Sequence, residues 1–81
     1  MNEQTAEEIK EFILASFSTM EMIYTNAADM ERESFDYMNQ AIISGAKVAI
    51  LFEIIDELGW KDELSMNEET RQALQKWGYA I

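Results

Sequence analysis

Carboxylates are the side chains in this sequence whose type and spacing could do chemistry. Glu33 and Asp36 are three residues apart, and Glu53 precedes Asp56 and Glu57 by three and four residues. Residues three and four apart on an α-helix lie on the same face, so each set would project its carboxylates together. Carboxylate oxygens grouped in this way can hold a divalent cation such as Mg²⁺.

The rest of the sequence argues against an enzyme. The all-α nucleotide pyrophosphohydrolases hold magnesium with similar Glu-x-x-Glu and Glu-x-x-Asp pairs, but here no Lys or Arg is placed for a phosphate, and a helix this acidic has such spacings by chance. The chain has no histidine, no cysteine and no serine in a G-x-S-x-G setting. Zinc ligands and glycine-rich phosphate loops are also missing. We therefore expect a protein with no catalytic residues, no bound metal and no cofactor.

The net charge restricts the partners that the protein can bind. Sixteen Asp and Glu residues stand against six Lys and Arg residues, which gives a net charge of −10 on 81 residues. Such a surface repels nucleic acids and anionic membranes, so we expect neither as a direct partner. It favours a basic protein, although the same charge would also simply keep a small protein soluble.

The composition predicts one folded domain over residues 1–81. Hydrophobic residues make up 48% of the chain, which is too many for a disordered acidic tail. Residues 1–10 are polar and acidic, unlike a signal peptide, and the longest purely apolar run, residues 48–52, is far shorter than the ~20 residues that span a bilayer. Because there is no cysteine for disulfides, we expect a cytoplasmic location.

Hydrophobic periodicity predicts an all-α fold in which a long helical hairpin is followed by a short C-terminal helix. The predicted helices lie at about 5–26, 29–58 and 66–77. Thr5 with Glu8, and Ser65 with Glu68, have the spacing of a capping box and indicate helix starts. These patterns place a small three-helix domain on the chain.

The ends of the predicted helices are marked unequally. Gly59 and Gly78 have the position of glycines that terminate helices. The break between the first two helices has no glycine, and Asn26 or Asp29 is a competent N-cap there. The alternative is one continuous helix over residues 5–58, about 80 Å long, and we favour the hairpin.

The second predicted helix changes its apolar side along its length. Up to Lys47 the polar residues share one side, whereas Ile50 and Ile54 project from that same side after it. Residues 48–52 are apolar all round, which predicts a segment that is buried on every side. Phe12 and Phe35, by contrast, fall on the predicted inward faces and are expected in the core.

Three arrangements explain this change of side. A kink at Ser44–Gly45 could re-aim the second half of the helix. The second half could instead pack against another chain, for which a homodimer is the simplest form. The third arrangement is a monomer in which the first and third helices enclose the segment. We favour the homodimer, and the apolar residues expected to meet another chain are Leu14, Met22, Ile43, Ile50, Leu51 and Ile54.

The acidic residues concentrate on both sides of the apolar middle. Residues 21–36 contain five acids and one arginine, residues 53–69 contain seven acids and one lysine, and residues 37–52 contain Lys47 as their one charged residue. In a hairpin the two acidic segments lie at opposite ends. The acids expected to face a partner are Asp29, Glu31, Glu33, Asp36, Glu53, Asp56, Glu57, Asp62 and Glu63.

The sequence thus predicts a non-enzymatic, acidic protein-binding module. Carboxylates arranged along a surface can take the place of phosphates against Lys and Arg of a partner. Small acidic helical proteins of phages and mobile elements mimic DNA in this way, and block nucleic-acid-handling proteins as inhibitors or masks. The alternative is a self-assembling helical adaptor or structural subunit that acts through apolar helix faces.

Overall fold

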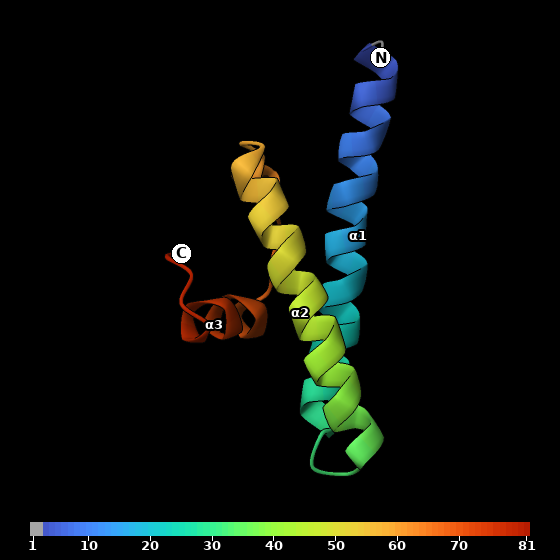
Figure 1. The fold of residues 1–81 in the computed structure, drawn as a ribbon, viewed down its shortest axis with the longest axis vertical. Helices are drawn as coiled ribbons and strands as arrows, with labels where there is room; N and C mark the ends of the chain where they lie inside the picture. The colour runs from blue at the N-terminus through green and yellow to red at the C-terminus, as the bar shows by residue number, and fades with distance from the viewer. Residues whose placement is uncertain (1–2) are drawn as a thin grey trace.

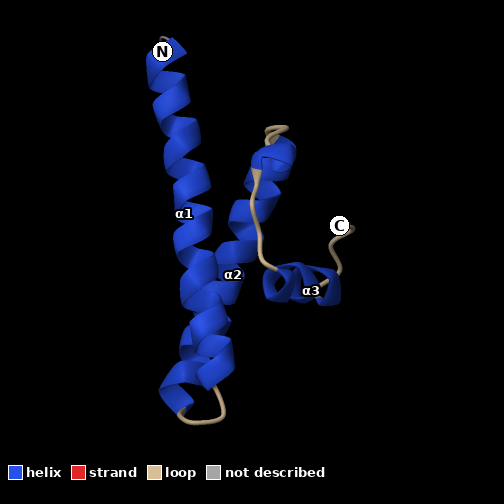
Figure 2. Ribbon diagram, turned by 180° about the vertical axis from the view of Figure 1, so that it is seen from behind, coloured by secondary structure: helices blue, strands red, loops and turns tan. Residues whose placement is uncertain are grey.

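The structure is a computed structural model that describes residues 3–81, with side chains from Thr5 onward. Those residues form helices with no strand, and three α-helices and one short 3₁₀ turn follow one another along the chain (Figures 1 and 2). The all-α class and the three helices are therefore confirmed. The elements are α1 (Glu3–Met30), α2 (Phe35–Glu57), η1 (Lys61–Glu63) and α3 (Glu68–Lys76).

The two long helices form an antiparallel hairpin. They are joined by the turn at the bottom of Figure 1 and diverge toward the other end, where the first turns of α1 extend beyond α2. From the end of α2 the chain runs back along the hairpin, and α3 lies across it beside α2 (Figure 2). The molecule is elongated, with extents of 47 × 24 × 16 Å.

Two predicted helix starts are wrong. α1 already includes Thr5, so the Thr5 hydroxyl does not mark its beginning. α3 begins after Asn67 and not after Ser65: the Asn67 side-chain oxygen accepts a hydrogen bond from the Thr70 amide at 2.8 Å. Asparagine is as good an N-cap as serine, and here it is the residue with the extended backbone that a cap requires.

The turn of the hairpin lies later than predicted. α1 continues through Asn26 and Asp29 to Met30, and the N-cap of α2 is Ser34, whose hydroxyl accepts from the Asp36 amide at 3.1 Å. The sequence between residues 25 and 30 contains no glycine or proline to stop a helix. With two alanines there, continuing α1 is favoured over breaking it.

The glycine-terminated helix ends are confirmed. Gly59 has a φ of 77°, and the Trp60 amide donates to the Ile55 carbonyl at 2.9 Å, as in a Schellman ending. Gly78 has a φ of 102°, and the Tyr79 amide makes the corresponding bond at 3.0 Å. Both positive φ values are accessible to glycine at little cost.

The buried side of α2 is one continuous stripe. Its members follow one another at intervals of three or four residues and include a serine and a glycine: Ala41, Ser44, Gly45, Val48, Phe52 and Ile55. The helix is continuous through Ser44–Gly45 and its buried residues keep to one side along its length, so the change of side is wrong. Ser44 can lie inside because its hydroxyl donates to the Gln40 carbonyl at 2.6 Å.

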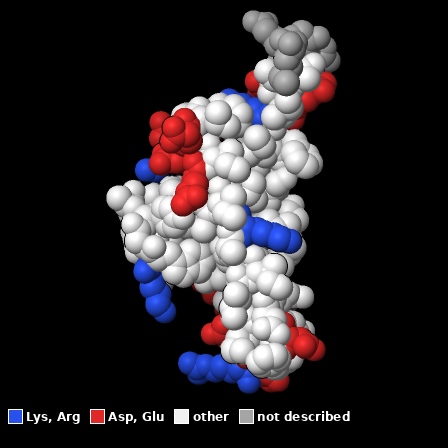
Figure 3. Space-filling view, viewed as in Figure 1, with Lys and Arg blue, Asp and Glu red and all other residues white. Residues whose placement is uncertain are grey.

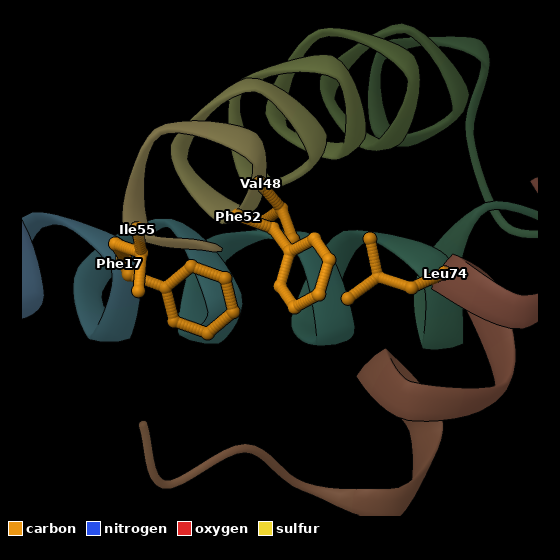
Figure 4. Packing of buried hydrophobic residues seen from close by; sticks show 5 residues of the cluster. All are labelled: Phe17, Val48, Phe52, Ile55 and Leu74. Atoms are coloured by element: carbon orange, nitrogen blue, oxygen red, sulfur yellow. The ribbon is translucent and has the colours of Figure 1, made fainter. Parts of the chain in front are cut away.

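The core lies where all three helices meet. Phe17 of α1, three residues of α2 and Leu74 of α3 are fully or almost fully buried there, and Figure 4 shows their side chains gathered in the space between the helices. The prediction that residues 48–52 are buried on every side is wrong for the single chain, because Ile50 is 57% exposed. Phe12 and Phe35 are also outside the core, at 72% and 71% exposed.

Candidate protein-binding surface

The side of α2 that points away from its buried stripe is largely apolar. We call Ile42, Ile43, Ala46, Ile50 and Ile54 the outer face of α2; all five are exposed, and each of the four isoleucines is at least 40% exposed. Successive members lie one to four residues apart and so share one side of the helix. Exposed apolar residues that share one side of a helix in this way make the face a candidate interaction site.

Charge is sparse around this face and dense beyond it. Figure 3 shows the side of the molecule on which α2 lies in front: its middle is mostly uncharged, and acidic side chains gather near the end of α2 and around the hairpin turn. The sequence explains this distribution, because Lys47 is the one charged residue between 37 and 52.

The predicted acidic residues form two groups at opposite ends of α2, and all nine are exposed. The turn pole consists of Asp29, Glu31, Glu33 and Asp36, and the far pole consists of Glu53, Asp56, Glu57, Asp62 and Glu63. The length of α2 separates the two poles by about 30 Å. Most of the outer face of α2 lies between them, and Ile54 lies beside Glu53 of the far pole.

Some acids of the far pole already have partners in the chain. Glu63 pairs with the Lys10 ammonium at 2.6 Å, and this hydrogen bond raises the pKa of Lys10. The Lys10 ammonium also lies 5.6 Å from the centre of the Trp60 ring. Glu53 accepts a hydrogen bond from the Tyr79 hydroxyl at 2.5 Å, which raises the pKa of Tyr79. Asp56, Glu57 and Asp62 remain exposed at this end.

The predicted apolar contacts divide into three groups. Ile43, Ile50 and Ile54 are brought together on the outer face of α2. Leu14 and Leu51 are half-buried and pack against the core of the same chain. Met22 is 72% exposed but belongs to α1.

Sequence reasoning missed two features of this surface. The first is Ile42, which is 64% exposed although it lies on the apolar side of the helix before Lys47. The buried side there is instead marked by the small residues Ala41 and Gly45, followed by Val48. A groove between α2 and α3, lined by Tyr24, Trp77 and other residues, was not anticipated. It depends on where α3 docks, which no local pattern specifies.

The described residues offer two further observations. Among the side chains described from Thr5 onward, no three acidic groups lie close enough together to hold a metal ion. Within that part of the chain α2 is the helix with the length and apolar composition of a membrane span, a property it shares with core helices of soluble proteins. A third of the apolar stretch of α2 is buried within the fold.

The fold and surface define a small all-α protein, a helical hairpin with a short third helix docked across it. Comparisons with family models, curated proteins and solved structures gave no match. Function is therefore argued from the surface itself.

Proposed function

We propose that the protein is a non-enzymatic protein-binding module that covers a basic surface of its partner. The outer face of α2 is the centre of the contact, and the turn pole and the far pole are its charged ends. The observation that carries this proposal is the exposure of four isoleucines on α2 between two acidic groups.

The parts of this surface have the properties of an interface centre and its surroundings. Fully burying an isoleucine is worth roughly 1.5–3 kcal/mol, so covering four half-exposed ones supplies several kcal/mol. Charges around an interface contribute chiefly to the rate of association and to the choice of partner. Apolar side chains would thus provide affinity, and the poles would select a basic protein.

The partner class that we propose is a nucleic-acid-handling protein, met in the cytoplasm. Such a protein presents Lys and Arg for phosphates, and carboxylates about 30 Å apart at the ends of α2 would engage that surface at two places. The module would then act as an inhibitor or mask, in the manner of a nucleic-acid mimic.

The test is capture from an extract of the cells that make the protein, compared between matched variants. Wild-type protein is expected to retain a basic protein, and Ile50→Asp to lose it. Ala15→Asp is the control, because it adds the same charge to an exposed position of α1. Neutralising Glu53, Asp56 and Glu57 together is expected to weaken capture most at low salt. Equal capture by wild type and Ile50→Asp would contradict the proposal.

Self-association is a second candidate function, in which the chain is a helical adaptor or structural subunit. The observation that favours it is that residues 37–52 of α2 contain no acid, so two copies could meet over Ile42, Ile43 and Ile50 without placing carboxylates together. Sedimentation at high micromolar concentration would give a dimer for wild type and a monomer for Ile50→Asp. A strict monomer for wild type would remove this candidate.

A further inference from the structure

A groove of about 420 Å³ runs between α2 and the segment that contains α3. It is distinct from the outer face of α2, although Ile42 and Ala46 border both. Aromatic side chains from α1 and from the end of the chain stand beside it, and small residues of α2 contribute to its lining. The lining residues used below are Tyr24, Glu31, Gly45, Ala46, Trp77 and Tyr79.

The aromatic side of the groove is held in place by packing. The Tyr24 and Trp77 rings meet edge to face, with their centroids 5.6 Å apart. Gly45 permits this arrangement, because a Cβ atom there would lie 3.1 Å from Cη2 of Trp77 and 3.2 Å from Cε1 of Tyr24. Tyr79 is fixed in a similar way by its edge-to-face contact with Phe52, at 5.5 Å.

Negative charge accompanies the aromatic rings. Glu31 lines the groove, and Glu69 and Glu31 both act on the Tyr24 hydroxyl, whose pKa is raised by burial and then by these two carboxylates. Near Tyr79 the carboxylate of Glu53 accepts a hydrogen bond from the tyrosine hydroxyl. Among the residues that line the groove there is no Lys or Arg.

We infer that this groove receives an arginine side chain of the basic partner. The inference rests on the proposed function and gives the partner's chemistry at one point of contact. Aromatic faces attract cations, and the planar guanidinium both stacks on rings and pairs with carboxylates. The rings of Tyr24, Trp77 and Tyr79 supply the aromatic faces, and Glu31 supplies the carboxylate. A neutral side chain would gain neither the attraction of the rings for a cation nor the ion pair with Glu31.

The probe that tests the groove is N-acetyl-arginine N-methylamide, followed by NMR. We expect saturable changes in the chemical shifts of the Gly45 amide and the Trp77 indole N–H. The matched control is the citrulline analogue, which has nearly the same shape but no charge and should bind at least about threefold more weakly, the ratio that a modest cation–π contact gives. Glu31→Gln should weaken arginine binding by a similar factor.

Variants separate the groove from general attraction to an acidic protein. Ala46→Leu adds bulk to the groove at an exposed helical position, so it should abolish the shifts while the fold is retained. Ala15→Leu places the same side chain on α1 and should leave them unchanged. Equal responses to the arginine and citrulline probes, shifts confined to the acidic poles, or full binding by Ala46→Leu would each overturn the inference.

The outcome is independent of the test of the proposed function. The probe needs no partner, and Ile50→Asp does not alter a residue that lines the groove. If capture does not depend on Ile50 but arginine binds beside Trp77, the proposed function is wrong and the groove still binds arginine. If capture depends on Ile50 but the probe does not bind, the partner is held by the outer face without an arginine in the groove.

Discussion

At the scale of single residues, Thr70 is the buried polar group that the fold leaves unsatisfied. Its side chain in α3 is fully buried, and its Oγ1 has no hydrogen-bond partner among the described residues. A buried hydroxyl without a partner costs free energy relative to an apolar group of the same shape. Thr70 therefore contributes to the packing through its methyl group, and its hydroxyl makes no favourable contribution to stability.

We predict that Thr70→Val leaves the free energy of unfolding unchanged or raises it by up to about 1 kcal/mol. Thr70→Ser is the comparison: it keeps the hydroxyl and loses the buried methyl group, so it should be destabilising by about 1 kcal/mol. Urea unfolding measures both. A valine variant that is less stable than the serine variant would show that the hydroxyl has a partner.

Gly45 permits a close approach whose partners the sequence does not specify. In the fold, Trp77 and Tyr24 approach the helix at this residue. In a helix interior Gly→Ala normally adds about 1 kcal/mol to stability. We predict that Gly45→Ala adds less than this, because the new methyl displaces the Trp77 ring, and that tryptophan emission shifts. A full gain in stability with unchanged fluorescence would contradict this role.

At the scale of the elements, one buried carboxylate joins α1 to the start of α3. Glu21 is 9% exposed, and its Oε2 accepts a hydrogen bond from the Asn67 amide at 2.9 Å. Asn67 in turn caps α3 through the Thr70 amide. The link spans 46 residues of sequence, so it positions α3 against the hairpin.

We predict that Glu21→Ala lowers the free energy of unfolding by about 1–3 kcal/mol, because it removes a charge-assisted hydrogen bond and leaves the Asn67 amide unpaired. Glu21→Gln retains an acceptor oxygen and should cost less. Glu7→Ala, at an exposed position of α1, is the control. Hydrogen exchange should show the loss first in α3, and equal behaviour of Glu21→Ala and Glu7→Ala would refute the link.

The elements also show how far the sequence could predict the structure. The helices and the endings at Gly59 and Gly78 follow from periodicity and from glycine's access to positive φ. The position of the hairpin turn does not follow from the sequence in this way, because α1 continues past Asn26 and Asp29, although each of them could cap a helix. The outer face was not predictable as a whole: α2 is apolar on several sides, so periodicity cannot specify which side meets α1. The groove requires the docking of α3 by the Glu21 link.

At the scale of the whole molecule, excess negative charge should make stability depend on pH. Burial and a hydrogen bond with Asp29 raise the pKa of Glu69. The folded chain therefore binds this proton more tightly than the unfolded chain does. The contribution of Glu69 to stability then rises as the pH falls from above its folded pKa toward the ordinary glutamate value of about 4.3.

We predict that the Tm increases as the pH falls from 7 through the raised folded pKa of Glu69, since protonation also relieves repulsion within a chain of charge −10. Glu69→Gln should raise the Tm at pH 7 and flatten its pH dependence. Glu68→Gln removes the same charge one residue earlier and should leave more of that dependence in place. A Tm that falls steadily over this range in wild type would contradict the prediction.

The charges and apolar groups of the whole molecule combine into one arrangement. The outer face of α2 is exposed, the turn pole lies beyond one end of it, and the far pole begins beside Ile54 at the other end. The central claim is that this face contacts a protein when the molecule works.

Site-specific photo-crosslinking in the cells that make the protein tests this claim most directly. A photoreactive phenylalanine analogue at position 50 is compared with the same analogue at position 15, an exposed site on α1. We predict a discrete protein adduct from position 50, either with a basic protein or with a second copy, and none from position 15. Equal adducts from both positions, or transfer from position 50 to lipid, would contradict it.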